Sequence, residues 1–72
     1  MAILDITGLT SPITIVNVRK TLGQLEAGDV LIVHADDTFA MQDVPSFCKN
    51  NCHQLLMAHE KKGVLIFEIK KG

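Results

Sequence analysis

The chain contains no tryptophan, no tyrosine and only three phenylalanines among its 72 residues. Hydrophobic residues still make up 47% of the sequence, so a core has to be built from Ile, Val and Leu. No apolar run approaches the roughly 18 residues that a membrane span needs. The first residues also lack the charged and then apolar order of a secretory signal peptide. We therefore expect a cytoplasmic protein that makes no membrane contact.

Neither sign of charge dominates, because seven basic residues oppose eight acidic ones and the formal net charge is −1. Such a balance produces no long-range field that would attract nucleic acid, so we expect no direct nucleic-acid partner. Cysteine is scarce as well, with Cys48 and Cys52 the only two. If both lie on one helix, their spacing of four residues is unfavourable for a disulfide, and reduced thiols are expected.

The first half of the chain has the pattern of a strand, a helix and a second strand. β-branched residues predict a strand over 2–7. Apolar positions spaced by three and four predict a helix that starts at Ser11 and ends at Gly28. The uninterrupted apolar run 30–33 predicts a central strand that is buried on both faces.

A second helical region is predicted over 39–50. Pro45 lies inside it and removes one backbone hydrogen bond, which predicts a break or kink just before the proline. Asn50 and Asn51 are expected to end the helix, because asparagine tolerates the left-handed conformation.

The last part of the chain is predicted to form a hairpin from residues 53–60 and 64–71. Gly63 suits the positive φ of the turn between them. The resulting order βαβαββ predicts a two-layer α/β sandwich, with a four-stranded mixed sheet and two helices on one face. All of residues 1–72 are expected to form a single domain.

Ser11 and Pro12 mark the start of the first predicted helix. Proline lacks an N–H and has a nearly helical φ, so it suits the first helical position, and Ser11 then falls at the N-cap. A group at position 11 would face the positive end of the helix dipole. We therefore predict that Ser11 is an N-cap worth about 1 kcal/mol.

The same segment resembles the TusA/SirA-like family of small sulfur-carrier proteins, whose motif is Cys-Pro-x-Pro. Ser11 stands in place of the family's carrier cysteine and Thr14 in place of its second proline. Residues 43–49 are similar to the family's Asp-Ile-Pro-Ala-Phe-Cys-Arg, and Cys52 occupies a position where the family keeps glycine. The resemblance covers the whole chain and implies the βαβαββ two-layer fold. The motif residues are Gly8, Leu9, Ser11, Pro12 and Thr14.

In the family, the carrier thiolate accepts a sulfane sulfur and passes it on. A serine hydroxyl forms no persulfide, and the sequence neighbours of Ser11 include no general base. The resemblance therefore implies a sulfur-relay protein that binds a sulfurtransferase-type protein partner, as a monomer or weak oligomer and without a cofactor. Whether the chain is an enzyme stays open, because the carrier cysteine is missing. Arg19 and Lys20 occupy the family's basic pair and are candidates for partner binding, with a solvated helix face as an equal alternative.

Two further hypotheses remain. One is an active persulfide carrier that uses Cys48, predicted to be a buried and inert thiol, or Cys52, near a helix C-terminus whose negative dipole end disfavours a thiolate. The other is a regulatory or metal-binding module that reuses the fold. Cys48, Cys52, His53 and His59 offer the ligand types of tetrahedral zinc, but their spacing matches no usual site, and no metal is expected.

Overall fold

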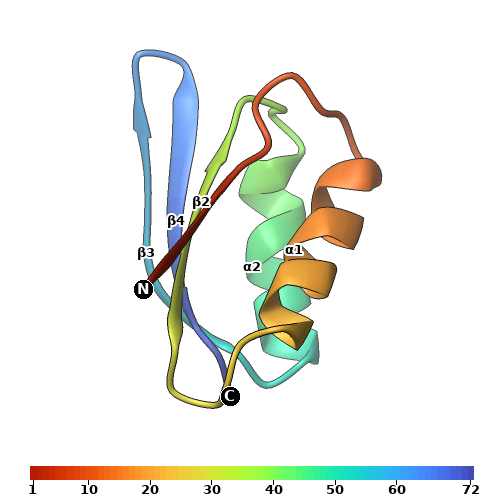
Figure 1. The fold of residues 1–72 in the computed structure, drawn as a ribbon. Helices are drawn as coiled ribbons and strands as arrows, with labels where there is room; N and C mark the ends of the chain where they lie inside the picture. Colours follow the sequence, from red (N-terminus) through yellow and green to blue (C-terminus); the bar gives the residue numbers. More distant parts are fainter.

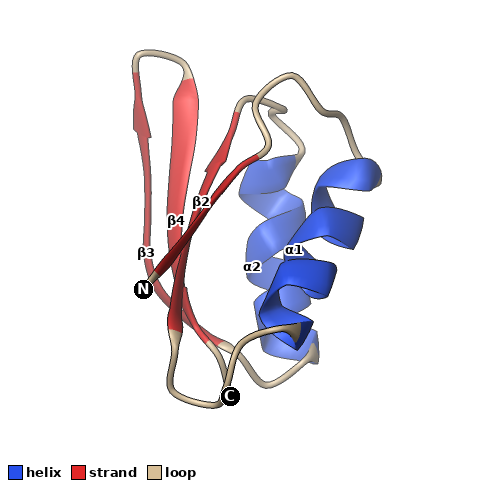
Figure 2. Cartoon of the chain, viewed as in Figure 1, coloured by secondary structure: helices blue, strands red, loops and turns tan.

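Two helices pack against one face of a four-stranded sheet in the computed structural model, which describes residues 1–72 (Figures 1 and 2). This arrangement and its βαβαββ order confirm the predicted two-layer α/β sandwich. Neither helix combines the length and apolar character that crossing a membrane would require. The elements are β1 (Ala2–Asp5), α1 (Ile13–Gly23), β2 (Val30–Ala35), α2 (Ala40–Asn50), β3 (Gln54–Lys61) and β4 (Val64–Lys70).

The strands lie in the order β1-β2-β4-β3. β1 and β2 are parallel, whereas β4 pairs antiparallel with both β2 and β3, so the sheet is mixed as predicted. Because parallel strands end at the same edge of a sheet, the loops that follow β1 and β2 lie at the same end of the molecule. Figure 1 shows the loop before α1, in red to orange, beside the green loop before α2.

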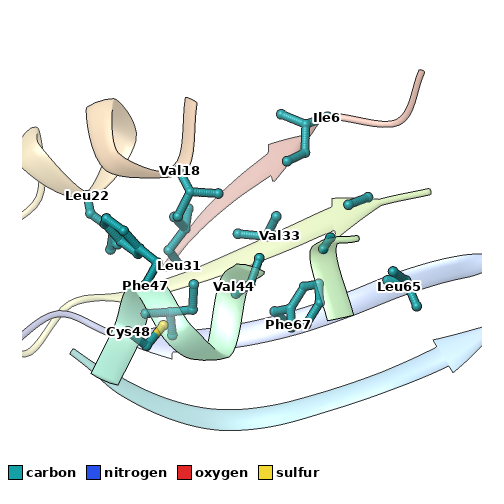
Figure 3. Packing of buried hydrophobic residues seen from close by; sticks show 13 residues of the cluster. Ile6, Val18, Leu22, Leu31, Val33, Val44, Phe47, Cys48, Leu65 and Phe67 are labelled. Carbon is teal, nitrogen blue, oxygen red and sulfur yellow. The ribbon is translucent and has the colours of Figure 1, made fainter. Parts of the chain in front are cut away.

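The core lies between the sheet and the helices and is mainly aliphatic (Figure 3). On β4, every second residue is buried, as expected for a strand with one face against the core. On α1, Val18 and Leu22 are buried one turn apart, while Ile15 and Leu25 pack partly buried against the core. The buried hydrophobic residues are Ile6, Val18, Leu22, Leu31, Val33, Ala35, Ala40, Val44, Phe47, Cys48, Leu65, Phe67 and Ile69.

The start of α1 differs from the prediction. The helix begins at Ile13, Pro12 takes the N-cap position after a cis peptide bond, and no side chain caps the helix. The backbone N–H groups of Ile13 and Thr14 donate instead to the carbonyl oxygen of Thr10, at 2.9 and 3.4 Å. The prediction that Ser11 is the N-cap is therefore wrong, because a backbone turn satisfies these N–H groups.

The end of α1 also lies earlier than predicted. The helix stops at Gly23, and Gln24 is its C-cap residue. Gly28 has a φ of +93° and belongs to the turn that enters β2. Its N–H donates to the carbonyl oxygen of Lys71 at 2.8 Å, which ties this turn to the end of β4.

The helix α2 runs without interruption through Pro45, so the predicted break is not found. The helix ends at Asn50 with Asn51 as its C-cap, as predicted, but Cys52 rather than an asparagine has positive φ, at +60°. The N–H of His53 donates to the carbonyl oxygen of Cys48 at 2.9 Å. This bond is the six-to-one hydrogen bond of a Schellman motif, in which the residue with positive φ reverses the chain after a helix.

The strand β2 is buried on one face rather than two. Leu31, Val33 and Ala35 are buried, whereas Val30 and Ile32 are only half-buried. Both helices lie on the same side of the sheet, as predicted, and leave the other side uncovered (Figure 2).

Candidate functional site

Ser11 lies where the loop after β1 meets the loop after β2 and the first turns of α2. Its Oγ donates a hydrogen bond to Asp43 Oδ2 at 2.9 Å, and its backbone N–H donates to Asp37 Oδ2 at 2.6 Å. In the same loop, the N–H of Gly8 donates to Asp36 Oδ1 at 2.9 Å. Three carboxylates therefore hold the loop that carries Ser11.

No role was predicted from the sequence for these three aspartates. Asp36 and Asp37 follow β2, and the second oxygen of Asp37 accepts the N–H of Phe39 at 3.1 Å just before α2. Asp43 lies in the first turn of α2, where a carboxylate interacts favourably with the helix dipole. The predicted topology could have indicated them, because loops that follow neighbouring parallel strands meet at one edge of the sheet.

The contacts of Ser11 orient its hydroxyl without activating it as a nucleophile. The hydroxyl donates to a carboxylate, which is a weak base toward an alcohol, and no imidazole is among its hydrogen-bond partners. The negative charges of Asp37 and Asp43 also oppose an anion at this position, and at this range a full charge outweighs the partial charge of a helix terminus. The geometry therefore positions Ser11 as a donor that links the loop to α2.

Thr14, at the last motif position, lies in the first turn of α1 with its side chain fully buried. Its Oγ1 atom has no hydrogen-bond partner. A buried hydroxyl without a partner typically costs about 1 to 3 kcal/mol. Thr14 thus fills space in the core at the expense of an unsatisfied polar atom.

Exposed apolar side chains are frequent in the two loops and helix starts that adjoin Ser11. We define the Ser11 end as residues 7–16 together with residues 36–43, that is, the two loops and the adjoining helix starts. It carries five of the nine large hydrophobic residues that are exposed in the structure. These five are Leu9, Ile13, Val16, Phe39 and Met41, and the last four are each more than half exposed.

The basic pair Arg19 and Lys20 lies further along α1 and does not join Ser11. The backbone of Arg19 lies about 9 Å beyond that of Ile13 along the helix axis. Its guanidinium lies over the ring of Phe47 on α2, with 5.9 Å between Cζ and the ring centroid. The Phe47 ring also packs against the ring of His53 at 5.7 Å. Lys20 is exposed.

The two thiols occupy opposite environments at the C-terminal end of α2. Cys48 is buried in the core, and this burial raises the pKa of its thiol. Cys52 is exposed in the turn that follows the helix. The structure brings no group of three or more His, Cys, Asp or Glu side chains into an arrangement that could hold a metal ion, so Cys48, Cys52, His53 and His59 do not form the zinc site considered from the sequence.

Comparisons with known proteins agree with the family resemblance and with the fold. A sequence profile described as sulfurtransferase TusA matches residues 2–71. A candidate sulfur carrier protein of Neisseria meningitidis serogroup A is 42% identical over 67 residues, which are 93% of this chain and 90% of that protein. YrkI of Bacillus subtilis, also named as a candidate sulfur carrier, is 39% identical over 70 residues, 97% of this chain and 93% of that protein.

A solved structure gives the same result at the level of the fold. The crystal structure of a SirA-like protein from Desulfitobacterium hafniense superposes on this chain with a TM-score of 0.88 and 30% sequence identity. The match covers 100% of this chain and 99% of the other. The chain belongs to the TusA/SirA-like family of sulfur carrier proteins.

Proposed function

We propose that this chain takes part in a sulfur relay by binding a sulfurtransferase-type protein through the Ser11 end, without accepting sulfur itself. The observation that carries the proposal is the hydrogen bond between Ser11 and Asp43, at the position where the sequence resemblance places the carrier cysteine. A hydroxyl forms no persulfide, and this one is already engaged by a carboxylate. The site keeps a defined shape while it lacks the atom that would hold sulfur.

The surface of the Ser11 end supports a binding role. Apolar side chains that stay exposed together on a small soluble domain commonly mark a protein-binding surface. Ile13 and Phe39 flank Ser11 from the starts of the two helices and are 51% and 64% exposed. The exposed Lys20 on α1 would add a salt-dependent contact at the margin of this surface.

Neither remaining thiol is well placed for persulfide chemistry. Burial raises the pKa of Cys48, so its nucleophilic thiolate is disfavoured. Cys52 is exposed in the turn after α2, at the opposite end of that helix from Asp43 and Ser11. These environments support binding in preference to carriage of sulfur.

A loading experiment tests the absence of carriage. The chain is incubated with a cysteine desulfurase and cysteine and then weighed intact, beside a family member that carries Cys-Pro-x-Pro as the positive control. We expect the control to gain the mass of one sulfur atom and this chain to gain none. Loading that disappears in Cys52→Ser or Cys48→Ser would instead identify an active carrier that uses that thiol.

A binding experiment tests the surface. The same cysteine desulfurase serves as the probe, and its affinity for the chain is measured by titration. Phe39→Glu and Ile13→Glu should each weaken binding by about tenfold or more, because they place a charge in an apolar contact. Leu56→Glu is the matched control, since Leu56 is 44% exposed on β3, away from the Ser11 end. Equal affinity of all these variants would overturn the proposed surface.

The basic pair is tested separately with Arg19→Glu and Lys20→Glu. If the pair contacts the partner, charge reversal weakens binding, and binding by the unaltered chain decreases as salt is raised. Arg19→Glu also removes the contact with Phe47, so Lys20→Glu is the cleaner variant. Unchanged capture by Lys20→Glu would place the pair outside the interface.

A further inference from the structure

The face of the sheet that points away from the helices is left uncovered (Figure 2), and its two central strands carry several apolar residues there. A sheet with one solvated face normally alternates hydrophobic and polar residues along each strand. On β2, however, Val30 and Ile32 face away from the core, and on β4 Val64 and Ile66 do the same. The apolar run over 30–33 predicts a strand covered on both faces, and this chain covers only one.

The strand register arranges the outward side chains in rows. Residues directly opposite each other on neighbouring strands point to the same face. The outward positions of β2 and β4 follow from their buried neighbours, and Ile3 of β1 is 69% exposed. One row contains Ile3, Ile32, Glu68 and Met57, and the adjacent row contains Asp5, His34, Ile66 and His59.

We propose that a second copy of this chain packs against this open face, sheet against sheet. The two copies are related by a 180° rotation about an axis that is parallel to the strands, between the two sheets and between β2 and β4. In each row, the β1 residue of one copy therefore faces the β3 residue of the other, and the β2 residue faces the β4 residue. Asp5 of each copy then lies opposite His59 of the other, and Ile3 lies opposite Met57. The same two contacts recur on both sides of the axis, as a two-fold interface requires.

Sheet twist does not remove this pairing. Facing sheets pack with about 30° between their strand directions. The edge strands lie about 7 Å from the axis, so this angle displaces them by roughly 4 Å. That displacement is within the reach of the Asp5, His59 and Met57 side chains.

The charges of the face favour a second copy over a strongly charged partner. Asp5 and Glu68 are opposed by Lys61 and Lys70 on the same face, so neither sign dominates it. The whole chain has a formal net charge of −1, which leaves little repulsion between copies. A domain of this size also gains stability from association, because its own core is small.

Glu68 limits the strength of the dimer. It is the carboxylate in the interior of the face, and the two-fold rotation places it opposite Ile32 of the second copy. Lys70 lies two residues along β4 on the same face and is the cation nearest in sequence. Burial of a carboxylate that is only partly compensated is costly, so the dimer is weak.

Sedimentation velocity from micromolar to millimolar concentration tests the proposal without any partner protein. The chain should convert from monomer to dimer across this range. His59→Glu should weaken association about tenfold, because it places a carboxylate opposite Asp5 twice, while His59→Lys should retain it. Glu68→Gln should strengthen association, and Ile66→Glu should abolish it.

Val16→Glu is the matched control, since it adds the same charge at an exposed apolar position on α1. It should leave association unchanged, and thermal melts should show that each variant is folded. A chain that stays monomeric at millimolar concentration would overturn the proposal. So would a dimer that survives Ile66→Glu but not Val16→Glu, which would place the contact at the Ser11 end. Loss of cysteine desulfurase binding in Ile66→Glu, with the unaltered chain monomeric, would assign the face to that partner.

Discussion

Ser11 and Asp43 are joined by a 2.9 Å hydrogen bond that spans 32 residues of sequence. Both residues are partly shielded from water, and the acceptor is a carboxylate, so the bond belongs to the stronger, charge-assisted class. It connects the loop before α1 to the first turn of α2. The hydroxyl therefore contributes to the packing of two chain segments rather than to the capping of one helix.

This assignment predicts a coupling between the two residues. Ser11→Ala should cost about 1 kcal/mol in the free energy of unfolding, and Asp43→Ala should remove most of the same interaction. In a double-mutant cycle measured by denaturant melts, the coupling energy should be about 1 kcal/mol. An equal cost of Ser11→Ala with and without Asp43 would mean that the hydroxyl acts on some other group.

The carboxylates around position 11 also predict how a thiol would behave there. In Ser11→Cys, made in a Cys52→Ser background, the negative charge of Asp43 opposes ionisation and raises the pKa of the introduced thiol. Adding Asp43→Asn removes that charge and should lower this pKa. The pH dependence of alkylation measures both values, and an unchanged profile in the combined variant would show that Asp43 exerts no field on the site.

The sequence predicted the fold because the fold depends on periodic patterns. Leu65, Phe67 and Ile69 alternate toward the core, and Val18 and Leu22 repeat at helical spacing, as the periodicity indicated. Such patterns reflect burial, since most buried positions on a helix or strand are apolar. The number, type and order of the elements follow from them.

The site was less predictable because its contacts are long-range. Nothing near Ser11 in the sequence indicates that Asp37 and Asp43, 26 and 32 residues away, accept its hydrogen bonds. The Ser-Pro pair favoured an N-cap on local grounds, and the backbone turn at Thr10 satisfies the helix instead. Local propensity was overridden at a place where two loops meet.

Thr14 gives a prediction about stability. Its buried Oγ1 has no partner, and valine has nearly the same shape without the hydroxyl. Thr14→Val should therefore stabilise the fold by about 1 kcal/mol in denaturant melts. Thr14→Ser is the contrasting variant, because it keeps the hydroxyl, removes a buried methyl group and should destabilise the fold. A loss of stability in Thr14→Val would reveal a hydrogen bond to Oγ1 in solution.

Cys48 predicts a dependence of stability on alkaline pH. Burial raises the pKa of its thiol in the folded state, so its contribution is fully present below the unfolded-state thiol pKa of about 8.5. As the pH rises above that value, the unfolded chain ionises first and the free energy of unfolding falls. Cys48→Ala should show a shallower fall over the same pH range, whatever its stability at neutral pH. Parallel pH profiles for the two proteins would contradict the assignment.

Cys52 provides the remaining prediction, because it adopts a φ of +60° in the turn after α2. Side chains with a Cβ atom pay roughly 1 kcal/mol or more in the left-handed region, and glycine does not. Helices commonly end with glycine at this position, and glycine is what the family resemblance places here.

Cys52→Gly should therefore raise the free energy of unfolding by about 0.5 to 1 kcal/mol, measured by denaturant melts under reducing conditions. Cys52→Ala is the control, since it removes the same thiol and keeps a Cβ, and it should bring no comparable gain. The expected difference between the two variants isolates the backbone conformation from any effect of the sulfur atom. Equal stability of Cys52→Gly and Cys52→Ala would mean that residue 52 is not held at positive φ in solution.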